Sequence, residues 1–132
     1  MMRIISFITM LCSIVGCSAQ SEGFSSLSVD DYEKAIADSG VVRLDVRTAE
    51  EYAEGHIEGT LNIDVLKPDF EQKATTLLPA GRTIAVNCRS GKRSKNAARI
   101  LVAHGYTVIE LDKGYNAWID AGKPIVSTVY GK

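Results

Sequence analysis

Several features are missing from this chain of 132 residues. The mostly apolar stretch from Ile4 to Val15 is too short to span a membrane comfortably. The net charge is only −1, so no general affinity for nucleic acid follows. The three cysteines include no Cys-x-x-Cys pair, which disfavours a thiol redox centre that needs a resolving thiol. Neither internal repeats nor low-complexity segments occur.

The remaining composition is that of an ordinary folded domain. Hydrophobic residues make up 45% of the chain and charged residues 23%, which are globular values. The length is about that of one domain, enough for a single core. We therefore expect one compact unit.

The amino-terminal residues have the pattern of an export signal. Arg3 precedes the apolar stretch, and small residues follow it. Ile14-Val15-Gly16-Cys17 resembles a bacterial lipobox, in which the cysteine is lipidated; a retained anchor or cleavage after Ala19 fits less well. We therefore expect a signal peptide at 1–16, membrane attachment through a lipid on Cys17, and a periplasmic or surface lipoprotein of the bacterial cell envelope.

This interpretation leaves Cys88 without a disulfide partner in its own chain. Removal of residues 1–16 takes away Cys12, and an acylated Cys17 cannot form a disulfide. An unpaired thiol in an exported protein indicates a functional use rather than a structural cross-link.

Behind a polar tether at 17–26, strands and helices alternate through a domain at 27–128. Ser28 with Asp31, and Thr48 with Glu51, have the spacing of helix capping boxes. Such alternation predicts an α/β fold of three layers, with a central, mostly parallel sheet flanked by helices. The predicted strands are 41–46, 61–64, 83–87 and 107–111, and the predicted helices begin at 28, 48, 69, 94 and 115.

Cys88 directly follows the strand predicted at 83–87, at the edge of a parallel sheet where ligands gather. The chain must turn there from strand to helix, and Gly91 permits the turn. Inward amides, the positive helix end and the cations Arg89, Lys92 and Arg93 would favour a thiolate, which is the nucleophilic form. The alternative, an inert buried cysteine, fits poorly because polar or charged residues surround Gly91.

Three ordered motifs resemble those of the rhodanese-like sulfurtransferases. Cys88-Arg89-Ser90-Gly91-Lys92-Arg93-Ser94 is similar to the Cys-x-x-Gly-x-Arg-Ser loop of that family, and the resemblance extends from about Ser28 to Val126. The other two motifs are Asp45-Val46-Arg47 through Gly55-His56-Ile57 to Asn62-Ile63, and Gly105-Tyr106 through Gly114 and Trp118 to Pro124. The chain departs from the family pattern at Lys113-Gly114, where a Gly-Gly pair is common, and at Thr60, where alanine is commoner.

The resemblance implies a persulfide cycle that needs no metal or other cofactor. Cys88 would take sulfur from a small anionic donor such as thiosulfate and pass it to cyanide, a thiol or a protein acceptor. Asp45 and Arg47 would support the loop structurally, and Arg93 would hold the loop, with a carboxylate as its expected partner. The substrate-binding candidates are Arg89, Ser90, Gly91, Lys92, Arg93 and Ser94, with Arg89 and Lys92 as the expected donor contacts.

Two other functions remain open at this point. Cysteine-dependent phosphatases and arsenate reductases use a similar loop, but their pattern is Cys-x5-Arg, whereas four residues separate Cys88 from Arg93. A non-catalytic sulfur-binding or docking module would retain the fold without turnover, and the presence of Cys88 favours an enzyme instead. His56 and Trp118 are interpreted as a hydrogen-bonding structural residue and a core residue.

Overall fold

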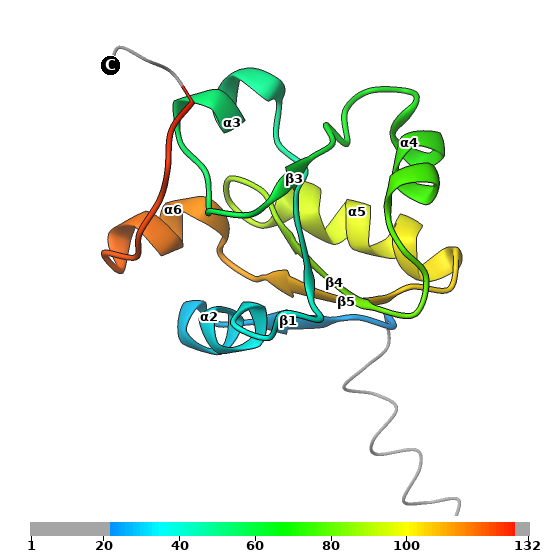
Figure 1. The fold of residues 1–132 in the computed structure, drawn as a ribbon, viewed down its shortest axis with the longest axis horizontal. Coiled ribbons are helices and arrows are strands. Elements are labelled where there is room, and N and C mark those ends of the chain that lie inside the picture. Colours follow the sequence, from blue (N-terminus) through cyan, green and yellow to red (C-terminus); the bar gives the residue numbers. More distant parts are fainter. Residues whose placement is uncertain (1–21, 129–132) are drawn as a thin grey trace, which may run out of the picture.

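In the computed structural model, which describes residues 22–128, a five-stranded sheet lies between two layers of helices (Figure 1). The strand order is β1-β5-β4-β2-β3, and every pair of neighbours is parallel. The predicted α/β fold with flanking helices is therefore confirmed. The strands are β1 (Ser25–Leu27), β2 (Val42–Asp45), β3 (Leu61–Asn62), β4 (Thr83–Asn87) and β5 (Thr107–Leu111), and the helices are α2 (Val29–Ile36), α3 (Ala49–Glu54), α4 (Phe70–Leu77), α5 (Lys92–Ala103) and α6 (Gly114–Asp120).

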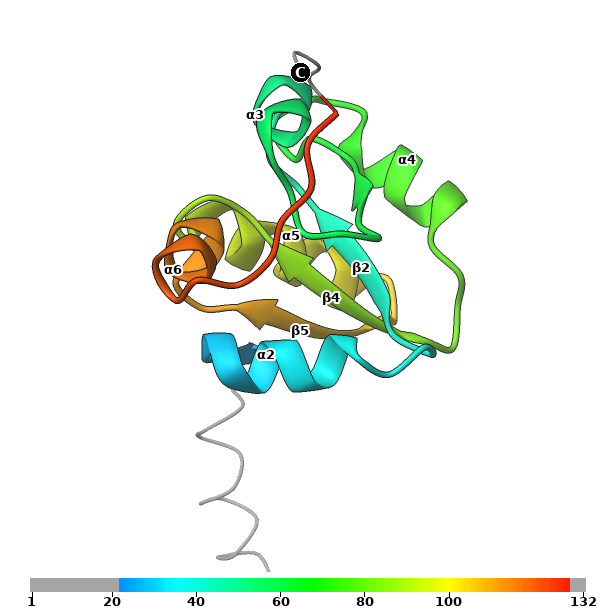
Figure 2. The same ribbon diagram turned by 60° about the vertical axis from the view of Figure 1, so that its left-hand side comes forward.

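The two faces of the sheet bury separate apolar clusters. Alternate residues of β4 point to opposite faces, so Ile84 and Val86 join one cluster and Ala85 joins the other. Helices α4 and α5 cover the first face, and α2 and α6 cover the second (Figure 2). Trp118 is buried in the second cluster, edge-on to Tyr32, as expected of a core residue.

Both predicted helix starts are capped by a hydroxyl. The Ser28 hydroxyl accepts from the Asp31 amide at 3.2 Å, and the Thr48 hydroxyl accepts from the Glu51 amide at 3.2 Å. At Thr48 the box is reciprocal, because a Glu51 carboxylate oxygen accepts from the Thr48 amide at 3.0 Å. This bond fixes the direction of the Glu51 side chain at the edge of the sheet.

The structure adds one strand and lengthens one helix relative to the prediction. Strand β1 pairs in parallel with β5 and uses Ser25 and Ser26, which the sequence placed in the tether. Helix α5 begins at Lys92 rather than Ser94, because Gly91 takes a left-handed conformation at the N-cap, with φ of 103°. The loop after Cys88 is correspondingly short.

The carboxyl ends of β2 and β4 bring the predicted site residues to one edge of the sheet. Asp45 ends β2 and pairs in register with Asn87, which ends β4 and precedes Cys88. The predicted signal peptide and Cys17 lie outside the described residues. Within residues 22–128, no helix is both long enough and apolar enough to cross a bilayer.

Candidate active site

Glycine permits close packing on both sides of the loop that carries Cys88. A Cβ at Gly91 would lie 1.9 Å from the Asp112 carbonyl oxygen, and one at Gly114 would lie 2.4 Å from the Arg89 carbonyl oxygen. The start of α6 then holds the loop: the Tyr115 amide donates to the Cys88 carbonyl at 2.7 Å. The close approach falls at Gly114, the second position of the Lys113-Gly114 pair, and this position retains glycine.

The Cys88 sulfur lies beneath the loop with a backbone donor directed at it. Its side chain is buried, with 1% of the residue exposed, and the Gly91 amide donates to Sγ at 3.1 Å. Sγ also lies 3.5 Å from Ser94 Oγ, one turn into α5. Within the part of the chain that the structure describes, Cys88 forms no disulfide. A thiolate here would receive an amide hydrogen bond and the positive end of a 12-residue helix.

A fully buried carboxylate, Glu110, lies behind Ser94. Ser94 Oγ donates to Glu110 Oε1 at 2.6 Å, and Lys95 Nζ lies 3.1 Å from Oε2 in an ion pair that is not aligned as a hydrogen bond. Lys95 also donates to Asp112 Oδ1 at 2.9 Å and to the Gly91 carbonyl at 3.3 Å. Burial opposes the charge on Lys95, but the carboxylates of Asp112 and Glu110 outweigh it and raise the pKa of Lys95.

On the outer side of the loop, Glu51 binds two of the predicted loop cations. Arg93 forms two hydrogen bonds with its carboxylate, at 2.8 and 3.1 Å, and Arg89 forms one at 3.2 Å. The hydrogen bond from Arg93 is the main reason that the pKa of Glu51 lies far below its usual value of 4.5. We expected Arg93 to hold the loop through a carboxylate, and Glu51 makes that contact. Ser90 and Lys92 are exposed.

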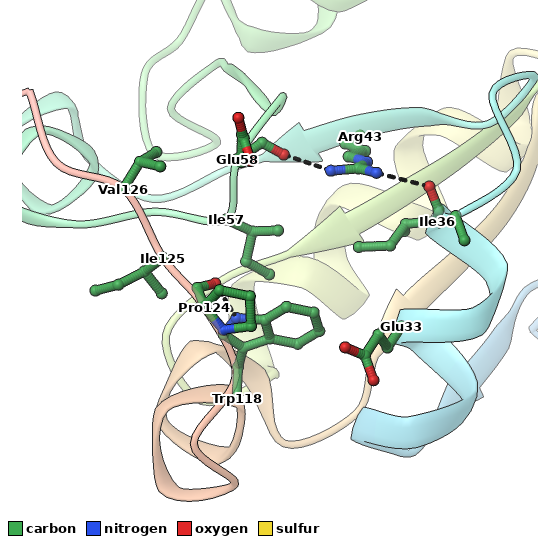
Figure 3. A pocket seen from close by; sticks show the side chains of 10 residues that line it. Glu33, Ile36, Arg43, Ile57, Glu58, Trp118, Pro124, Ile125 and Val126 are labelled. Carbon is green, nitrogen blue, oxygen red and sulfur yellow. Dashed lines mark hydrogen bonds between the residues drawn. The ribbon is translucent and has the colours of Figure 1, made fainter.

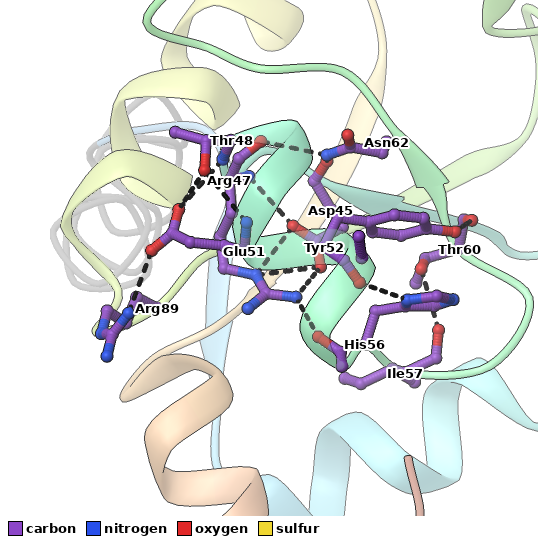
Figure 4. Close-up of polar contacts among 12 residues, drawn as sticks. Asp45, Arg47, Thr48, Glu51, Tyr52, His56, Ile57, Thr60, Asn62 and Arg89 are labelled. Carbon is purple, nitrogen blue, oxygen red and sulfur yellow. Dashed lines mark hydrogen bonds and ion pairs between the residues drawn. The ribbon is translucent and has the colours of Figure 1, made fainter. Parts of the chain in front are cut away.

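Asp45 and Arg47 form a buried ion pair next to the loop (Figure 4). Arg47 donates to both carboxylate oxygens of Asp45, at distances from 2.8 to 3.1 Å, and to the Gly55 carbonyl at 2.7 Å. Its guanidinium lies 4.1 Å from the centre of the Tyr115 ring. Since Tyr115 anchors the Cys88 carbonyl, the pair supports the loop from the neighbouring strand.

His56 contacts backbone and ring rather than the sulfur. Its Nδ1 lies 2.7 Å from the Tyr52 carbonyl oxygen, and its ring stacks on the Tyr52 ring at 3.6 Å between centroids (Figure 4). The Tyr52 hydroxyl in turn donates to the Thr60 carbonyl. These contacts give His56 a structural role, in agreement with the sequence-based interpretation.

A polar cavity of about 470 Å³ opens beside the loop, between α3 and α6. Arg89 is the loop residue that lines it, and its side chain is 59% exposed. A second hollow of about 220 Å³, between α2 and the segment after α6, contains no residue of the loop (Figure 3). The 470 Å³ cavity is lined by Arg47, Glu51, Glu54, Gly55, Arg89, Tyr115, Asn116, Ile119 and Asp120.

Four site residues were not identified as such from the sequence: Glu51, Lys95, Glu110 and Tyr115. Glu51 was assigned to a helix cap, and Tyr115 was placed at the start of a helix. Lys95 and Glu110 meet because α5 packs on β5, a contact that no local pattern records. Among residues 22–128, no group of three or more histidine, cysteine or acidic side chains is arranged to hold a metal ion.

Comparisons with known proteins agree with this architecture. The family model described as Rhodanese-like domain matches residues 28–121. Thiosulfate sulfurtransferase 18 of Arabidopsis thaliana is 34% identical over 123 residues, covering 84% of this chain and 90% of that protein. Protein HIGH ARSENIC CONTENT 1, mitochondrial, from the same plant is 36% identical over 106 residues; the match covers 72% of this chain but only 63% of that protein.

Solved structures show the same fold. The crystal structure of a rhodanese-related protein from Thermoplasma volcanium superposes with a TM-score of 0.69 at 27% identity, and the match covers 78% of this chain and 98% of that one. Because the family model spans most of the described residues, the match is not confined to the cysteine loop. This chain therefore belongs to the family of rhodanese-like domains.

Proposed function

We propose that this protein is a sulfurtransferase that carries a sulfane sulfur on Cys88 as a persulfide. The observation that carries the proposal is the Gly91 amide, which donates to Sγ at 3.1 Å at the positive end of α5. A donor of this kind stabilises a thiolate, which is the attacking form of cysteine. Relatives named thiosulfate sulfurtransferase support the same class of activity.

The proposed cycle has two steps. In the first, the Cys88 thiolate attacks the outer sulfur of thiosulfate, a new S–S bond forms, and sulfite leaves with the electron pair of the broken bond. In the second, cyanide, a thiol or a protein acceptor attacks the terminal sulfur, and Cys88 leaves as thiolate. Each step exchanges one bond to sulfur for another, so no cofactor is required.

Arg89 is our candidate for contact with the anionic donor. It lines the cavity beside the loop, and a single hydrogen bond at 3.2 Å links it to Glu51. Arg93 is held by two bonds to the same carboxylate and is less exposed, so it is better placed to support the loop. Lys92, exposed at the first position of α5, is the second candidate cation. An exposed cation with one weak partner can rotate toward a substrate at little cost.

Mass spectrometry of the Cys88 peptide after thiosulfate treatment tests the proposal. We expect a gain of about one sulfur mass, roughly 32 Da, that cyanide reverses, because the intermediate is covalent. Cys88→Ser is the matched negative control. Turnover of thiosulfate without any mass gain on the wild-type peptide would reject the persulfide.

Arsenate reduction or phosphate-ester hydrolysis is the second candidate, since one relative carries the name HIGH ARSENIC CONTENT 1. The same thiolate could attack either oxyanion. The spacing of four residues between Cys88 and Arg93 gives a smaller loop than the Cys-x5-Arg pattern, which favours a single sulfur over a tetrahedral group. Incubation with arsenate or a phosphotyrosine mimic separates the candidates: turnover without sulfur uptake would select the second. A non-catalytic docking module would load sulfur without releasing product.

We also propose export and attachment to the cell envelope through a lipid on Cys17. The support is the lipobox-like Ile14-Val15-Gly16-Cys17. A clickable fatty acid supplied to bacterial cells that express the full chain should label it, and Cys17→Ser should remove the label. Equal labelling of both proteins would reject lipidation at this residue.

A further inference from the structure

Glu110 is a buried carboxylate behind the sulfur that the proposed cycle does not use. Its residue is 0% exposed, and it lies on the face of β5 that α5 covers. Oε1 lies 2.6 Å from Ser94 Oγ, and Ser94 Oγ lies 3.5 Å from Cys88 Sγ. A single hydroxyl group therefore connects the reacting sulfur to this carboxylate.

The proposed cycle begins and ends with a thiolate, so a Cys88 that rests as a thiol requires a place for one proton. That cysteine must lose its S–H proton before it attacks the donor, and the thiolate that the acceptor releases can take the proton back. Because only 1% of Cys88 is exposed, solvent has little direct access to that proton. Ser94 can accept from the S–H group and donate to Glu110 at the same time, since a hydroxyl is both donor and acceptor.

Charge favours a shared proton in this pair. A thiolate at Cys88 and a carboxylate at Glu110, joined through one hydroxyl, would place two like charges in a buried site. If Glu110 takes the proton, the site keeps a single negative charge, which moves from oxygen to sulfur. The other titratable or charged groups that act on the pair are Lys95, Asp112, Arg93 with its partners Glu51 and Asp64, and Tyr32 across the sheet.

We propose that Glu110 is a positioning residue that stores the Cys88 proton during sulfur transfer, with Ser94 as the link. The S–H bond breaks and its proton moves to Ser94 Oγ, while the Ser94 proton moves to Glu110 Oε1. The reverse transfer follows when the acceptor releases Cys88. No electrons are exchanged in either transfer, and the inference rests on the proposed function of the same site.

The surrounding contacts suit both protonation states. With Glu110 ionised, Ser94 donates to it and Lys95 neutralises it from 3.1 Å. With Glu110 protonated, the direction reverses: the carboxyl donates to Ser94, and Ser94 donates to the thiolate beside the Gly91 amide. Lys95 then retains Asp112 as its partner at 2.9 Å.

The test is the rate at which iodoacetamide, a small neutral reagent, alkylates Cys88, measured by mass spectrometry of its peptide from about pH 5 to about pH 10. A pair that shares one proton titrates in two steps, so the wild type should show a plateau between two rises in rate. Glu110→Gln keeps the shape of the side chain but cannot take the proton, so its profile should show one rise. Glu50→Gln, on the exposed first turn of α3, should keep both rises.

Ser94 provides a second, independent variant. Ser94→Ala removes the link and should lower the rate of Cys88 alkylation at pH 6 by roughly 10-fold to 100-fold, within the range of proton-transfer effects. Ser94→Thr keeps a hydroxyl and should restore the plateau. If a variant and the wild type are equally stable in thermal unfolding, a change in the alkylation profile of the variant does not reflect misfolding.

If the wild type, Glu110→Gln and Ser94→Ala all showed the same dependence of alkylation rate on pH, the inference would be overturned. The alkylation assay does not depend on sulfur transfer. A two-step profile in a protein that takes no sulfur from thiosulfate would reject the proposed function and keep the shared proton. A protein that takes sulfur from thiosulfate but shows a single rise in alkylation rate would reject the shared proton and keep the proposed function.

Discussion

Two carboxylates flank the Cys88 loop, and they differ in burial and partners. Glu51 lies on the outer side, with 19% of its side chain exposed, and binds the guanidinium groups of Arg89 and Arg93. Glu110 lies on the inner side, with no exposed surface, and binds the Ser94 hydroxyl and the Lys95 ammonium.

This difference shows that the same chemical group, a carboxylate, can have two roles at one site. The charge of Glu51 is fixed, because the hydrogen bond from Arg93 holds its pKa far below the usual value. A carboxylate with a fixed charge can organise cations but cannot exchange a proton near neutral pH. Glu110 also pairs with a cation, Lys95, but it accepts a hydrogen bond from a hydroxyl that reaches the sulfur, and we propose that its proton and that of Cys88 are coupled.

The largest expected effect comes from Gly91, which turns the loop between the two carboxylates. Gly91→Ala should destabilise the protein by about 2–4 kcal/mol, because φ is 103° and the new Cβ meets the Asp112 carbonyl oxygen. Sulfur loading should fall with it, since the amide moves away from Sγ. Gly105→Ala is the matched control: φ is 90°, but nothing lies within 4 Å of the added Cβ. Urea denaturation should rank Gly105→Ala as the milder change; equal losses would show that the Asp112 contact is unimportant.

Glu51→Gln tests the outer carboxylate. The substitution should lower the free energy of unfolding at pH 7 by about 1–3 kcal/mol, because two hydrogen bonds from Arg93 and one from Arg89 lose their charged acceptor. Glu50→Gln, in the same helical turn but exposed, should cost less than about 0.5 kcal/mol. Both values can be measured by urea denaturation.

Glu51→Gln should also change how the stability of the protein depends on pH. The pKa of Glu51 is lowered on folding, so its contribution is present in full above its usual value of 4.5 and is lost as the pH falls from there toward the folded-state pKa. The wild type should therefore lose more stability than Glu51→Gln on acidification below pH 4.5. If the wild type and Glu51→Gln lost stability in parallel as the pH falls, this would contradict the claim that the charge of Glu51 is fixed.

The smallest effect on stability is expected at Arg89. Arg89→Ala should change the free energy of unfolding by less than about 0.5 kcal/mol, because its ion pair with Glu51 is half-exposed. The KM for thiosulfate should rise several-fold with little change in kcat, if Arg89 contributes uniform binding. Lys113→Ala, which removes a more exposed cation near the loop, should leave KM nearly unchanged. A fall in kcat alone at Arg89 would assign it a different role.

Local patterns predicted most of the fold. Hydrophobic runs located β4 and β5 at their observed bounds, and the Thr48-x-x-Glu51 spacing predicted the start of α3. Strand β1 was missed because Ser25-Ser26-Leu27 has no strong strand pattern, and its pairing with β5 joins residues 84 positions apart along the chain, since 109 minus 25 is 84.

The candidate site was predicted in part, for a similar reason. The loop residues are contiguous, so their spacing could be recognised directly. The partners of the loop come from other elements: Glu51 is 42 residues from Arg93, and Glu110 is 16 residues from Ser94. Glu51 already had a complete local explanation as a capping residue. Only the packing of α5 on β5 shows that Glu110 faces the loop rather than solvent.

The most direct test of the account is a crystal structure of the protein after soaking with thiosulfate. We predict one additional sulfur bonded to Cys88 Sγ and held by backbone amides of the loop, with Arg93 still bound to Glu51. An unmodified Sγ beside an intact thiosulfate or other tetrahedral anion would contradict the claim that this loop accepts sulfur covalently.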